Sequence, residues 1–219
     1  MKYIIFGASG KMGEMIQAGM KKKGYTLVEG FNAKASLDKK VEADIAIDFS
    51  HADFFDEVLS YCISNKIPLM SGTTGLSDTQ LKNIKEAANI IPVLWASNTS
   101  VGIQFLRSLL APLKELADWD FHIIESHHID KLDSPSGTAK TLAEDLKLAT
   151  GKNIDISALR GGGIFGEHEI RIMGEGETIS LKHTALSRKL FSTGAIKAAE
   201  FLNQQKVGLY TMSDALGLH

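Results

Sequence analysis

The sequence predicts an α/β protein with a parallel sheet, followed by a second, smaller α+β domain. Over the first hundred residues, short apolar runs alternate with segments of helical periodicity. The runs read as apolar on both faces, which is typical of strands covered by helices on two sides. After about residue 100 the pattern changes, and alternating residues around Gly174–Gly176 indicate an antiparallel hairpin.

The first domain is expected to contain five strands and at least three helices. The strands are expected at Lys2–Phe6, Tyr25–Phe31, Ala43–Phe49, Ile67–Ser71 and Ile91–Ala96. One-faced helical spacing is found at Met12, Met15, Ile16 and Gly19, and again at Phe55, Val58, Leu59 and Cys62. Ser77–Gln80, "SDTQ", has the spacing of a capping box and predicts the start of a further helix.

The second domain is expected to carry a mixed or antiparallel sheet. A long helix is predicted over 101–117, a strand over 120–126 and a hairpin over 168–183. Between them, Ala139, Leu142, Ala143 and Leu146 share one helical face. A final helix around Ala195–Leu202 could return to the first domain, which periodicity does not decide. The expected boundaries are 1–100 plus 188–219 for a dinucleotide-binding domain, and 101–187 for a substrate-binding and oligomerisation domain.

Composition excludes several classes of protein. The chain has 219 residues, 44% hydrophobic and 23% charged, with a formal net charge of −2, so no global field attracts nucleic acid or an anionic membrane. No stretch approaches the length of an apolar membrane span. The N-terminus enters a strand directly, and the one cysteine, Cys62, cannot form an internal disulfide. We therefore expect a cytoplasmic protein that acts on a small molecule.

A glycine-rich turn follows the first expected strand. The stretch "GASGKMG", Gly7–Gly13, has the spacing G-x-x-G-x-x-G and opens the first helix. Glycines allow a tight turn and close approach of a pyrophosphate, which the N–H groups of the helix N-terminus would then bind. The alternative is a strand–helix turn without a ligand. Because the motif lies between strand one and helix one of an alternating chain, it predicts a Rossmann-type dinucleotide site.

Three further strand ends carry small polar residues: Asp48–Ser50, Gly72–Gly75 and Ala96–Ser100. In a parallel sheet these ends meet at one carboxyl edge, where a groove for a flat cofactor is expected. The end of the second strand, Asn32–Ala33, lacks the acidic residue that binds the ribose hydroxyls of NAD. Lys34 and Lys11 could instead meet a 2′-phosphate. The expected cofactor is NADPH and/or NADH, and these residues favour NADPH.

The stretch "ESHHIDKLDSPSGTA", Glu125–Ala139, suggests a metal, an anion or a proton transfer. His127 and His128 are adjacent, so on a strand their rings point to opposite faces and do not share one metal. Asp130 and Asp133 complete no zinc spacing. We therefore expect no metal site.

The same stretch also predicts an anion site at a helix N-terminus. Ser134 or Ser136 can cap the helix, and Gly137 lets a ligand approach the backbone. His128 and Lys131 could assist, leaving His127 or Lys131 to move a proton. The alternative is a capped helix beside two incidental histidines.

Taken together, these motifs resemble those of the bacterial 4-hydroxy-tetrahydrodipicolinate reductase (dihydrodipicolinate reductase) family of diaminopimelate and lysine biosynthesis. The resemblance extends through "GASGKMG", "IDFS", "GTTG", "ASNTSVG", "GEHEI" and "SRKLF". It implies NAD(P)H-dependent reduction, with loss of water, of a cyclic dicarboxylate by a homotetramer. It implies that His127 and Lys131 are catalytic and that His128, Ser136, Gly137 and Thr138 bind substrate. It assigns cofactor contacts to Gly7, Ala8, Ser9, Gly10, Lys11, Met12, Gly72, Thr73, Thr74, Ala96, Ser97, Asn98, Thr99, Arg188 and Phe191.

The chain departs from the family pattern in two ways: it is short between Lys34 and Val41, and it lacks the acidic ribose anchor. The second departure bears on cofactor preference. Two other functions compete with this one. A semialdehyde-type dehydrogenase would need a cysteine nucleophile, whereas Cys62 falls on the apolar face of a helix. A non-catalytic dinucleotide sensor would not need proton donors beside a carboxylate site.

Overall fold

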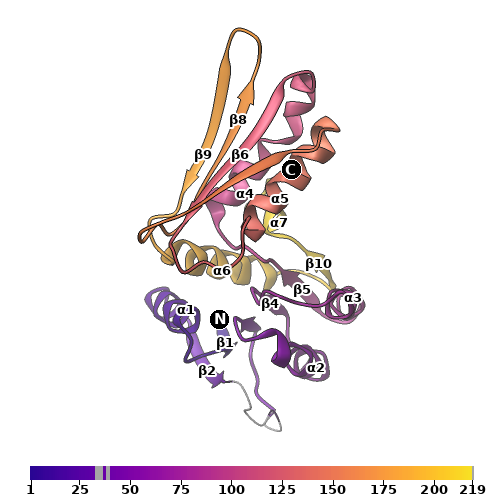
Figure 1. Cartoon of the computed structure of the whole chain (residues 1–219). Helices are drawn as coiled ribbons and strands as arrows, with labels where there is room; N and C mark the ends of the chain where they lie inside the picture. The colour runs from indigo at the N-terminus through magenta and orange to yellow at the C-terminus, as the bar shows by residue number, and fades with distance from the viewer. Residues whose placement is uncertain (33–36, 38–39, 219) are drawn as a thin grey trace. The chain divides into compact units, whose positions relative to one another are not determined.

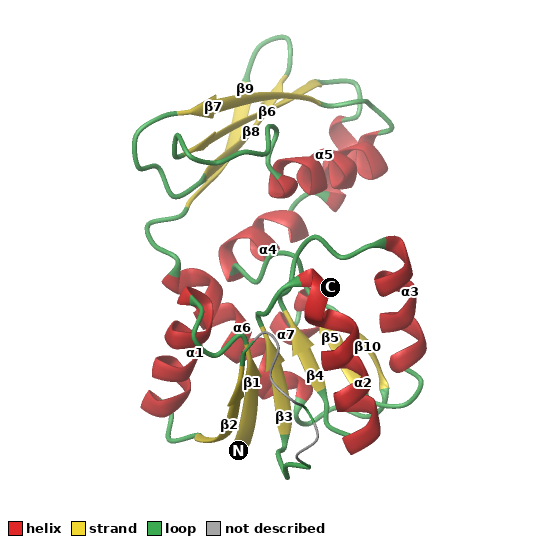
Figure 2. Ribbon diagram, turned by 60° about the horizontal axis from the view of Figure 1, so that its bottom comes forward, coloured by secondary structure: helices red, strands yellow, loops and turns green. Residues whose placement is uncertain are grey.

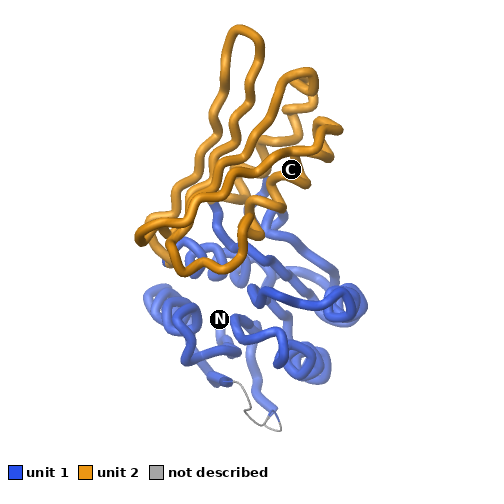
Figure 3. Tube along the Cα trace, viewed as in Figure 1, with its two compact units in different colours: residues 1–101, 189–219 blue, residues 102–188 orange. Residues whose placement is uncertain are grey.

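The computed structural model describes residues 1–32, 37 and 40–218. The chain divides into two compact units, which are coloured separately in Figure 3. The first unit contains residues 1–101 together with 189–219, and the second contains residues 102–188. Each unit has its own sheet and its own hydrophobic core.

The first unit is built on a six-stranded parallel sheet in the order β10-β5-β4-β3-β1-β2 (Figure 1). Its strands are β1 (Lys2–Phe6), β2 (Thr26–Phe31), β3 (Ile45–Asp48), β4 (Leu69–Ser71), β5 (Pro92–Trp95) and β10 (Gly208–Tyr210). The first five were predicted from the sequence and differ from the prediction only at their ends. β10 was missed, because its three residues are too few to show a period.

Helices cover both faces of this sheet (Figure 2). On one face α2 (Phe55–Asn65) and α3 (Asp78–Ala87) pack with Ile4 and Phe6, and a short 3₁₀ helix (Ala52–Phe54) precedes α2. On the other, α1 (Lys11–Lys22), α6 (Lys189–Leu202) and α7 (Met212–Leu216) pack with Tyr3 and Ile5. The alternation along β1 therefore supplies both cores.

The edge strand β2 is an exception to the expected two-sided burial. Thr26, Leu27 and Val28 are exposed, whereas Phe31 at its end is buried. An edge strand has a neighbour on one side only and is covered less completely, so the prediction that every strand is apolar on both faces was wrong here.

The helix α6 belongs to the first unit although it follows the second in sequence. Its buried residues Ala195, Ala198 and Ala199 lie in the same core as Ile5 and Ile16. Gly194 allows the helix to approach the loop after β5, because a Cβ at this position would overlap the carbonyl oxygen of Thr99. The hydroxyl of Thr99 in turn donates to the carbonyl of Phe191 at 2.9 Å.

The second unit contains a four-stranded mixed sheet in the order β7-β6-β8-β9. Its strands are β6 (Asp120–His127), β7 (Asp155–Arg160), β8 (Glu167–Met173) and β9 (Thr178–Thr184). The predicted hairpin is confirmed as the antiparallel pair β8–β9, whereas β7, which runs parallel to β6, was missed. The helix α5 (Gly137–Thr150) packs Ala139, Leu142 and Leu146 against Ile123 and Ile170 of the sheet.

The long helix expected over 101–117 is two elements. The helix α4 (Val101–Ser108) ends before Pro112, and a 3₁₀ helix (Ala111–Leu116) follows. Proline has no backbone N–H to donate and its ring clashes with the preceding helical turn. The apolar periodicity continues through this break, and for that reason the sequence suggested one helix.

The close approach at Gly194 gives a first prediction. Gly194→Ala should lower the free energy of unfolding by about 1–3 kcal/mol, the usual cost of overpacking, because the new methyl meets the backbone of Thr99. Urea unfolding would measure it, with the exposed neighbour Thr193→Ala as control, expected to stay within about 0.5 kcal/mol. A Gly194→Ala protein as stable as the control would show that the backbone of Thr99 does not exclude a side chain at residue 194.

Candidate functional site

The glycine-rich turn is the first part of the site, and it connects β1 to α1. Gly7 has a φ of +79°, and a Cβ there would overlap the carbonyl oxygen of Phe49. A Cβ on Gly13 would overlap the carbonyl oxygen of Gly7, so the turn and the helix can pack this closely only with glycines. Gly10 caps α1 without a side-chain hydrogen bond. The N-terminal N–H groups of α1 therefore have no side-chain cap from Gly10, as expected of an anion-binding turn.

The end of β2 supports this turn. Asn32 accepts hydrogen bonds from the Ser9 N–H at 2.9 Å and from the Ser9 hydroxyl at 2.8 Å. The side-chain oxygen at this strand end is therefore used to hold the glycine turn. Lys34, the other residue predicted near this point, lies outside the described residues.

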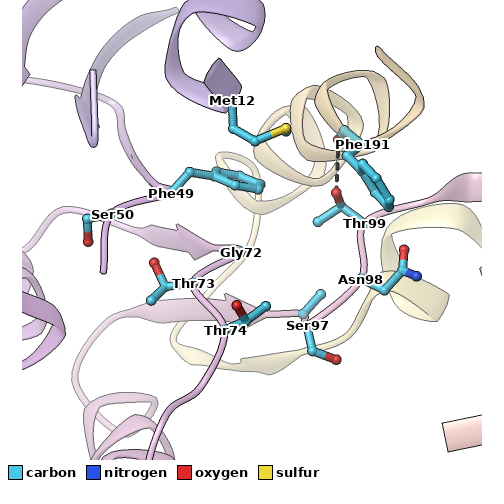
Figure 4. A pocket seen from close by; sticks show the side chains of 11 residues that line it. Met12, Phe49, Ser50, Gly72, Thr73, Thr74, Ser97, Asn98, Thr99 and Phe191 are labelled. Atoms are coloured by element: carbon cyan, nitrogen blue, oxygen red, sulfur yellow. Dashed lines mark hydrogen bonds between the residues drawn. The ribbon is translucent and has the colours of Figure 1, made fainter. Parts of the chain in front are cut away.

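A pocket of about 300 Å³ lies at the carboxyl edge of the parallel sheet. The chain leaves β1 first for β2 on one side and then for β3 on the other, and this reversal of strand order is where α/β sheets bind ligands. Figure 4 shows that residues following three strands, β3, β4 and β5, surround the pocket together with one residue each from α1 and α6. The lining residues are Met12, Phe49, Ser50, Gly72, Thr73, Thr74, Ala96, Ser97, Asn98, Thr99 and Phe191.

A buried carboxylate, Asp48, organises two of these strand ends. It accepts hydrogen bonds from the hydroxyls of Ser71 at 2.7 Å and Thr73 at 2.8 Å, and from the N–H and hydroxyl of Ser50. Asp48 is fully buried, so these donors replace the water that its oxygens would otherwise bind. The ends of β3 and β4 are thereby held together beneath the pocket.

Phe49 forms one apolar wall of the pocket. Its ring lies against Gly72, where any Cβ would overlap it. Met12 from α1 and Phe191 from α6 are the other large apolar side chains of the lining. A flat ring could therefore be held between apolar groups, with the hydroxyl-bearing residues Ser97 and Thr74 also in the lining (Figure 4).

The second unit carries a separate cluster of titratable groups at the end of β6, around Glu125. This side chain is fully buried. Arg160 donates to it through Nη1 at 3.0 Å and Nη2 at 2.7 Å, and the Ser136 N–H donates at 3.1 Å. The fourth nitrogen that bonds to the Glu125 carboxylate is Nδ1 of His127. One carboxylate therefore connects β6, β7 and the start of α5.

Burial and neighbouring charges set the protonation states of Glu125 and His127. Burial by itself would raise the pKa of Glu125, but hydrogen bonds from Arg160, His127 and Ser136 hold it below its ordinary value. Burial lowers the pKa of His127, and the hydrogen bond and charge of Glu125 only partly oppose this effect. Arg160 and Lys131 lower it further because like charges repel. The cluster therefore combines an ionised Glu125 with a His127 that is neutral at neutral pH.

The loop between β6 and α5 places the remaining predicted residues. Lys131 pairs with the Asp133 carboxylate at 2.7 Å, and the Gly137 N–H donates to the same carboxylate at 3.3 Å. Ser136 is the N-cap of α5, and its hydroxyl oxygen accepts from the Ala139 N–H at 3.2 Å. Of the two serines that the sequence offered as the cap, Ser136 is therefore the one used.

A second histidine, His168 on β8, lies beside His127 with ring centroids 5.2 Å apart. Its Nε2 is 3.3 Å from the Ser136 hydroxyl. Because that hydroxyl oxygen already accepts from Ala139, its hydrogen is free to be donated to His168. Burial lowers the pKa of His168 to about 4, so this ring is neutral in the physiological range.

The structure places the predicted residues in two groups. Nine of the predicted cofactor residues line the pocket of the first unit: Met12, Gly72, Thr73, Thr74, Ala96, Ser97, Asn98, Thr99 and Phe191. Gly7, Ala8, Ser9, Gly10 and Lys11 form the adjoining turn and the start of α1. The predicted catalytic and substrate residues lie at the end of β6, in the following loop and at the start of α5. Arg188 is the last residue of the second unit, next to α6.

Sequence reasoning missed several residues of both groups. Asp48 and Ser50 were identified only as small polar residues at a strand end, and Phe49 between them was not singled out. Glu125 was part of the stretch Glu125–Ala139, but no role was predicted for it. Its spacing of two residues from His127 predicts that both side chains lie on the same face of a strand. Arg160 had no detectable signal, because its strand β7 was not recognised.

Comparisons with known proteins agree with this architecture. Residues 1–99 match the family model "Dihydrodipicolinate reductase, N-terminus", and residues 101–216 match "Dihydrodipicolinate reductase, C-terminus". The 4-hydroxy-tetrahydrodipicolinate reductase of Clostridium novyi (strain NT) is 39% identical over 251 aligned positions, covering 98% of each chain. The alignment is longer than this 219-residue chain, so it contains gaps in this chain.

Two solved structures resemble the chain in fold. Dipicolinate-bound dihydrodipicolinate reductase from Paenisporosarcina sp. TG-14 has a TM-score of 0.81 at 21% identity, and the match covers 97% of this chain and 98% of that one. Aspartate semialdehyde dehydrogenase II from Vibrio cholerae has a TM-score of 0.56 at 12% identity, covering 91% and 97%. The family models match both halves of the chain, and the Clostridium relative matches nearly its full length; the chain therefore belongs to the dihydrodipicolinate reductase family.

Proposed function

We propose that this chain reduces 4-hydroxy-tetrahydrodipicolinate to tetrahydrodipicolinate with NAD(P)H and loss of water, with the first unit binding the cofactor and the second holding the substrate. The observation that carries this is the match of both halves to the two models of one reductase family. Its relatives are named 4-hydroxy-tetrahydrodipicolinate reductase, and the chain is accordingly an oxidoreductase, which we assign to diaminopimelate and lysine biosynthesis. The buried Cys62 supplies no nucleophile for semialdehyde chemistry.

The first unit has the features that a nicotinamide dinucleotide requires. The glycines let the turn pack closely against the start of α1, whose N-terminal N–H groups can bind a pyrophosphate, and the pocket beside the turn has apolar walls and small polar residues. When bound, the cofactor supplies the hydride. In this proposal Gly7–Met12 hold the phosphates, and the residues of the pocket place the nicotinamide ring.

The second unit has the features that an anionic substrate requires. The N-terminus of α5 presents Gly137 and Thr138 for a carboxylate, and Lys131 supplies a positive charge nearby. The carboxylate of Asp133 contacts Lys131 and the Gly137 N–H, so both groups are able to bind a carboxylate. His128, in the same loop, is proposed as a further contact. His127 and Lys131 handle the proton.

Support for a cyclic dicarboxylate also comes from a relative of the same fold, whose structure is described as dipicolinate-bound. A homotetramer is the assembly that we propose. The sheet of the second unit offers a surface for it, since Ile124 and Leu159 are exposed. Along the described part of the chain, no helix is both long and apolar enough to cross a membrane.

The roles of His127 and Lys131 give a kinetic prediction. His127→Ala and Lys131→Ala should each lower kcat by about 100-fold or more, the range for a positioned acid–base group. The affinity for NADPH should change little, because the glycine turn and its pocket lie in the first unit. Steady-state kinetics and a separate NADPH titration measure the two effects.

The matched control is Lys140→Ala, an exposed lysine on α5, which should keep normal kcat. The double variant of His127 and Lys131 should lose less than the product of the single losses, because groups that act as one unit are not additive. Near-normal kcat in both single variants would contradict the assignment.

Cofactor preference is a separate prediction. NADPH should be used at least as well as NADH, because the strand end at Asn32 has no carboxylate and its side chain is bonded to Ser9. The comparison is kcat/KM with each cofactor, for the natural chain and for Lys11→Ala and Lys34→Ala. A strong preference for NADH that neither substitution alters would refute it.

The neutral state of His168 predicts how stability depends on pH. The pKa of His168 is about 4 in the folded protein and near 6.5 when unfolded. Between these values the unfolded chain binds a proton that the folded chain does not, so stability falls as pH decreases through this window. Replacing His168 with Gln should reduce the stability lost between pH 7 and pH 5 by about 2 kcal/mol. Urea unfolding at both pH values tests this, and equal losses in the two proteins would show that His168 titrates normally.

A further inference from the structure

The carboxylate of Glu125 lies between the proposed proton-transfer histidine and the start of α5. Glu125 and His127 are two residues apart on β6, so their side chains point to the same face of the sheet. That face is the one covered by α5, and Glu125 is fully buried there. A buried carboxylate is costly unless other groups compensate its charge. Here Arg160, His127 and Ser136 do so.

The contact with Arg160 determines the protonation of Glu125. Both terminal nitrogens of the guanidinium donate, one to each carboxylate oxygen, and arginine stays charged at all physiological pH values. Glu125 is therefore ionised, and an ionised carboxylate can only accept hydrogen bonds. The hydrogen shared with His127 consequently belongs to Nδ1 of the ring.

This has a consequence for the other ring nitrogen. In a neutral histidine that carries its hydrogen on Nδ1, the second nitrogen, Nε2, has a free lone pair. Next to Nε2 lies Gly166, where a Cβ would be 3.0 Å away. A side chain at residue 166 would crowd Nε2, so the glycine keeps this ring nitrogen from being covered by its neighbour. His127 itself is 8% exposed, so access to the ring is narrow.

We propose that Glu125, held ionised by Arg160, is a positioning residue that keeps His127 in its Nδ1–H form and leaves Nε2 as an unprotonated acceptor toward the substrate. This rests on the proposed function, because the substrate is what Nε2 would contact. Glu125 itself touches no reacting atom. It acts through His127 and, by accepting from the Ser136 N–H, aligns the start of the helix that holds the substrate carboxylate.

The charged and titratable groups around His127 agree with a neutral ring. Among the described residues, Glu125 on the same strand is the anionic group that acts on His127, whereas Arg160 on β7 and Lys131 in the loop are cationic. His168 on β8 is neutral itself. The pKa of His127 is lowered, so burial and the two cations have a larger effect on it than the charge of Glu125. Orientation of the ring, rather than storage of a positive charge, is then the effect of Glu125.

A purely structural role for Glu125 is the alternative, because the same bonds join β6, β7 and α5. The two roles differ in their dependence on His127. A structural carboxylate would affect activity whether or not His127 is present. A positioning residue has no further effect once the ring that it positions has been removed.

The first experiment needs no substitution of Glu125 and no enzymatic activity. Long-range ¹H–¹⁵N spectra of histidine rings in the full chain at neutral pH report which nitrogen of each ring carries hydrogen. The signals of His127 are identified by their loss in His127→Ala. Hydrogen on Nδ1 supports the proposal, and hydrogen on Nε2 would overturn it, whatever reaction the protein catalyses.

The second experiment is a double-mutant cycle on kcat with Glu125→Gln, His127→Ala and both together. Glu125→Gln keeps the shape but loses the charge, and should lower kcat about 10-fold or more while NADPH affinity stays unchanged. In the His127→Ala background the same change should have little further effect. The control is Glu169→Gln, a carboxylate on β8 that pairs with Arg171 on the opposite face of the sheet.

The outcomes separate this inference from the proposed function. A natural chain without reductase activity would refute the function and leave the ring spectra to decide the state of His127. Two results in an active chain would refute the positioning role. One is a Glu125→Gln variant with the same kcat as Glu169→Gln. The other is a Glu125→Gln substitution that lowers kcat as much in the His127→Ala background as in the natural chain. If Glu125→Gln does not fold, the spectra of the natural chain still decide.

Discussion

The requirement that a buried carboxylate be fully hydrogen-bonded shapes both of the regions that we propose to be functional. Glu125 in the second unit and Asp48 in the first are each completely buried. Removing an ionised oxygen from water costs several kcal/mol unless donors replace the water. Those donors come from separate elements, so each carboxylate joins strands and loops that would otherwise be free to move apart.

The two carboxylates use different donors, and the difference suits their surroundings. Asp48 is bonded by Ser50, Ser71 and Thr73, whose small side chains leave the pocket above them open. Glu125 is bonded by Arg160, a full positive charge, and by His127. The hydroxyl cluster supports the pocket, where we propose that the cofactor binds, without adding net positive charge. The charged pair of Glu125 and Arg160 holds His127 in one protonation state, as the proposed proton transfer requires.

The two sheets arrange the residues of the two proposed sites in different ways. A parallel sheet brings successive strand ends to one edge, which places Met12, Gly72 and Asn98 around one pocket although they are far apart in sequence. The mixed sheet of the second unit instead places β7 and β8 on either side of β6, so that Arg160 and His168 flank Glu125 and His127. The pocket where we propose cofactor binding and the cluster where we propose proton transfer are thus built by different arrangements of strands.

Local patterns in the sequence determined the features that depend on neighbouring residues. The alternation of apolar runs indicated β1 to β5, and the glycine spacing indicated the turn at Gly7, because backbone conformation and one-sided burial are governed by residues a few positions apart. The family motifs placed His127 and Lys131 together for the same reason. Tertiary structure alone brought Arg160 to Glu125 across 35 residues and returned α6 to the first core. No local period records which distant side chain will compensate a buried charge, since only the folded chain removes that charge from water.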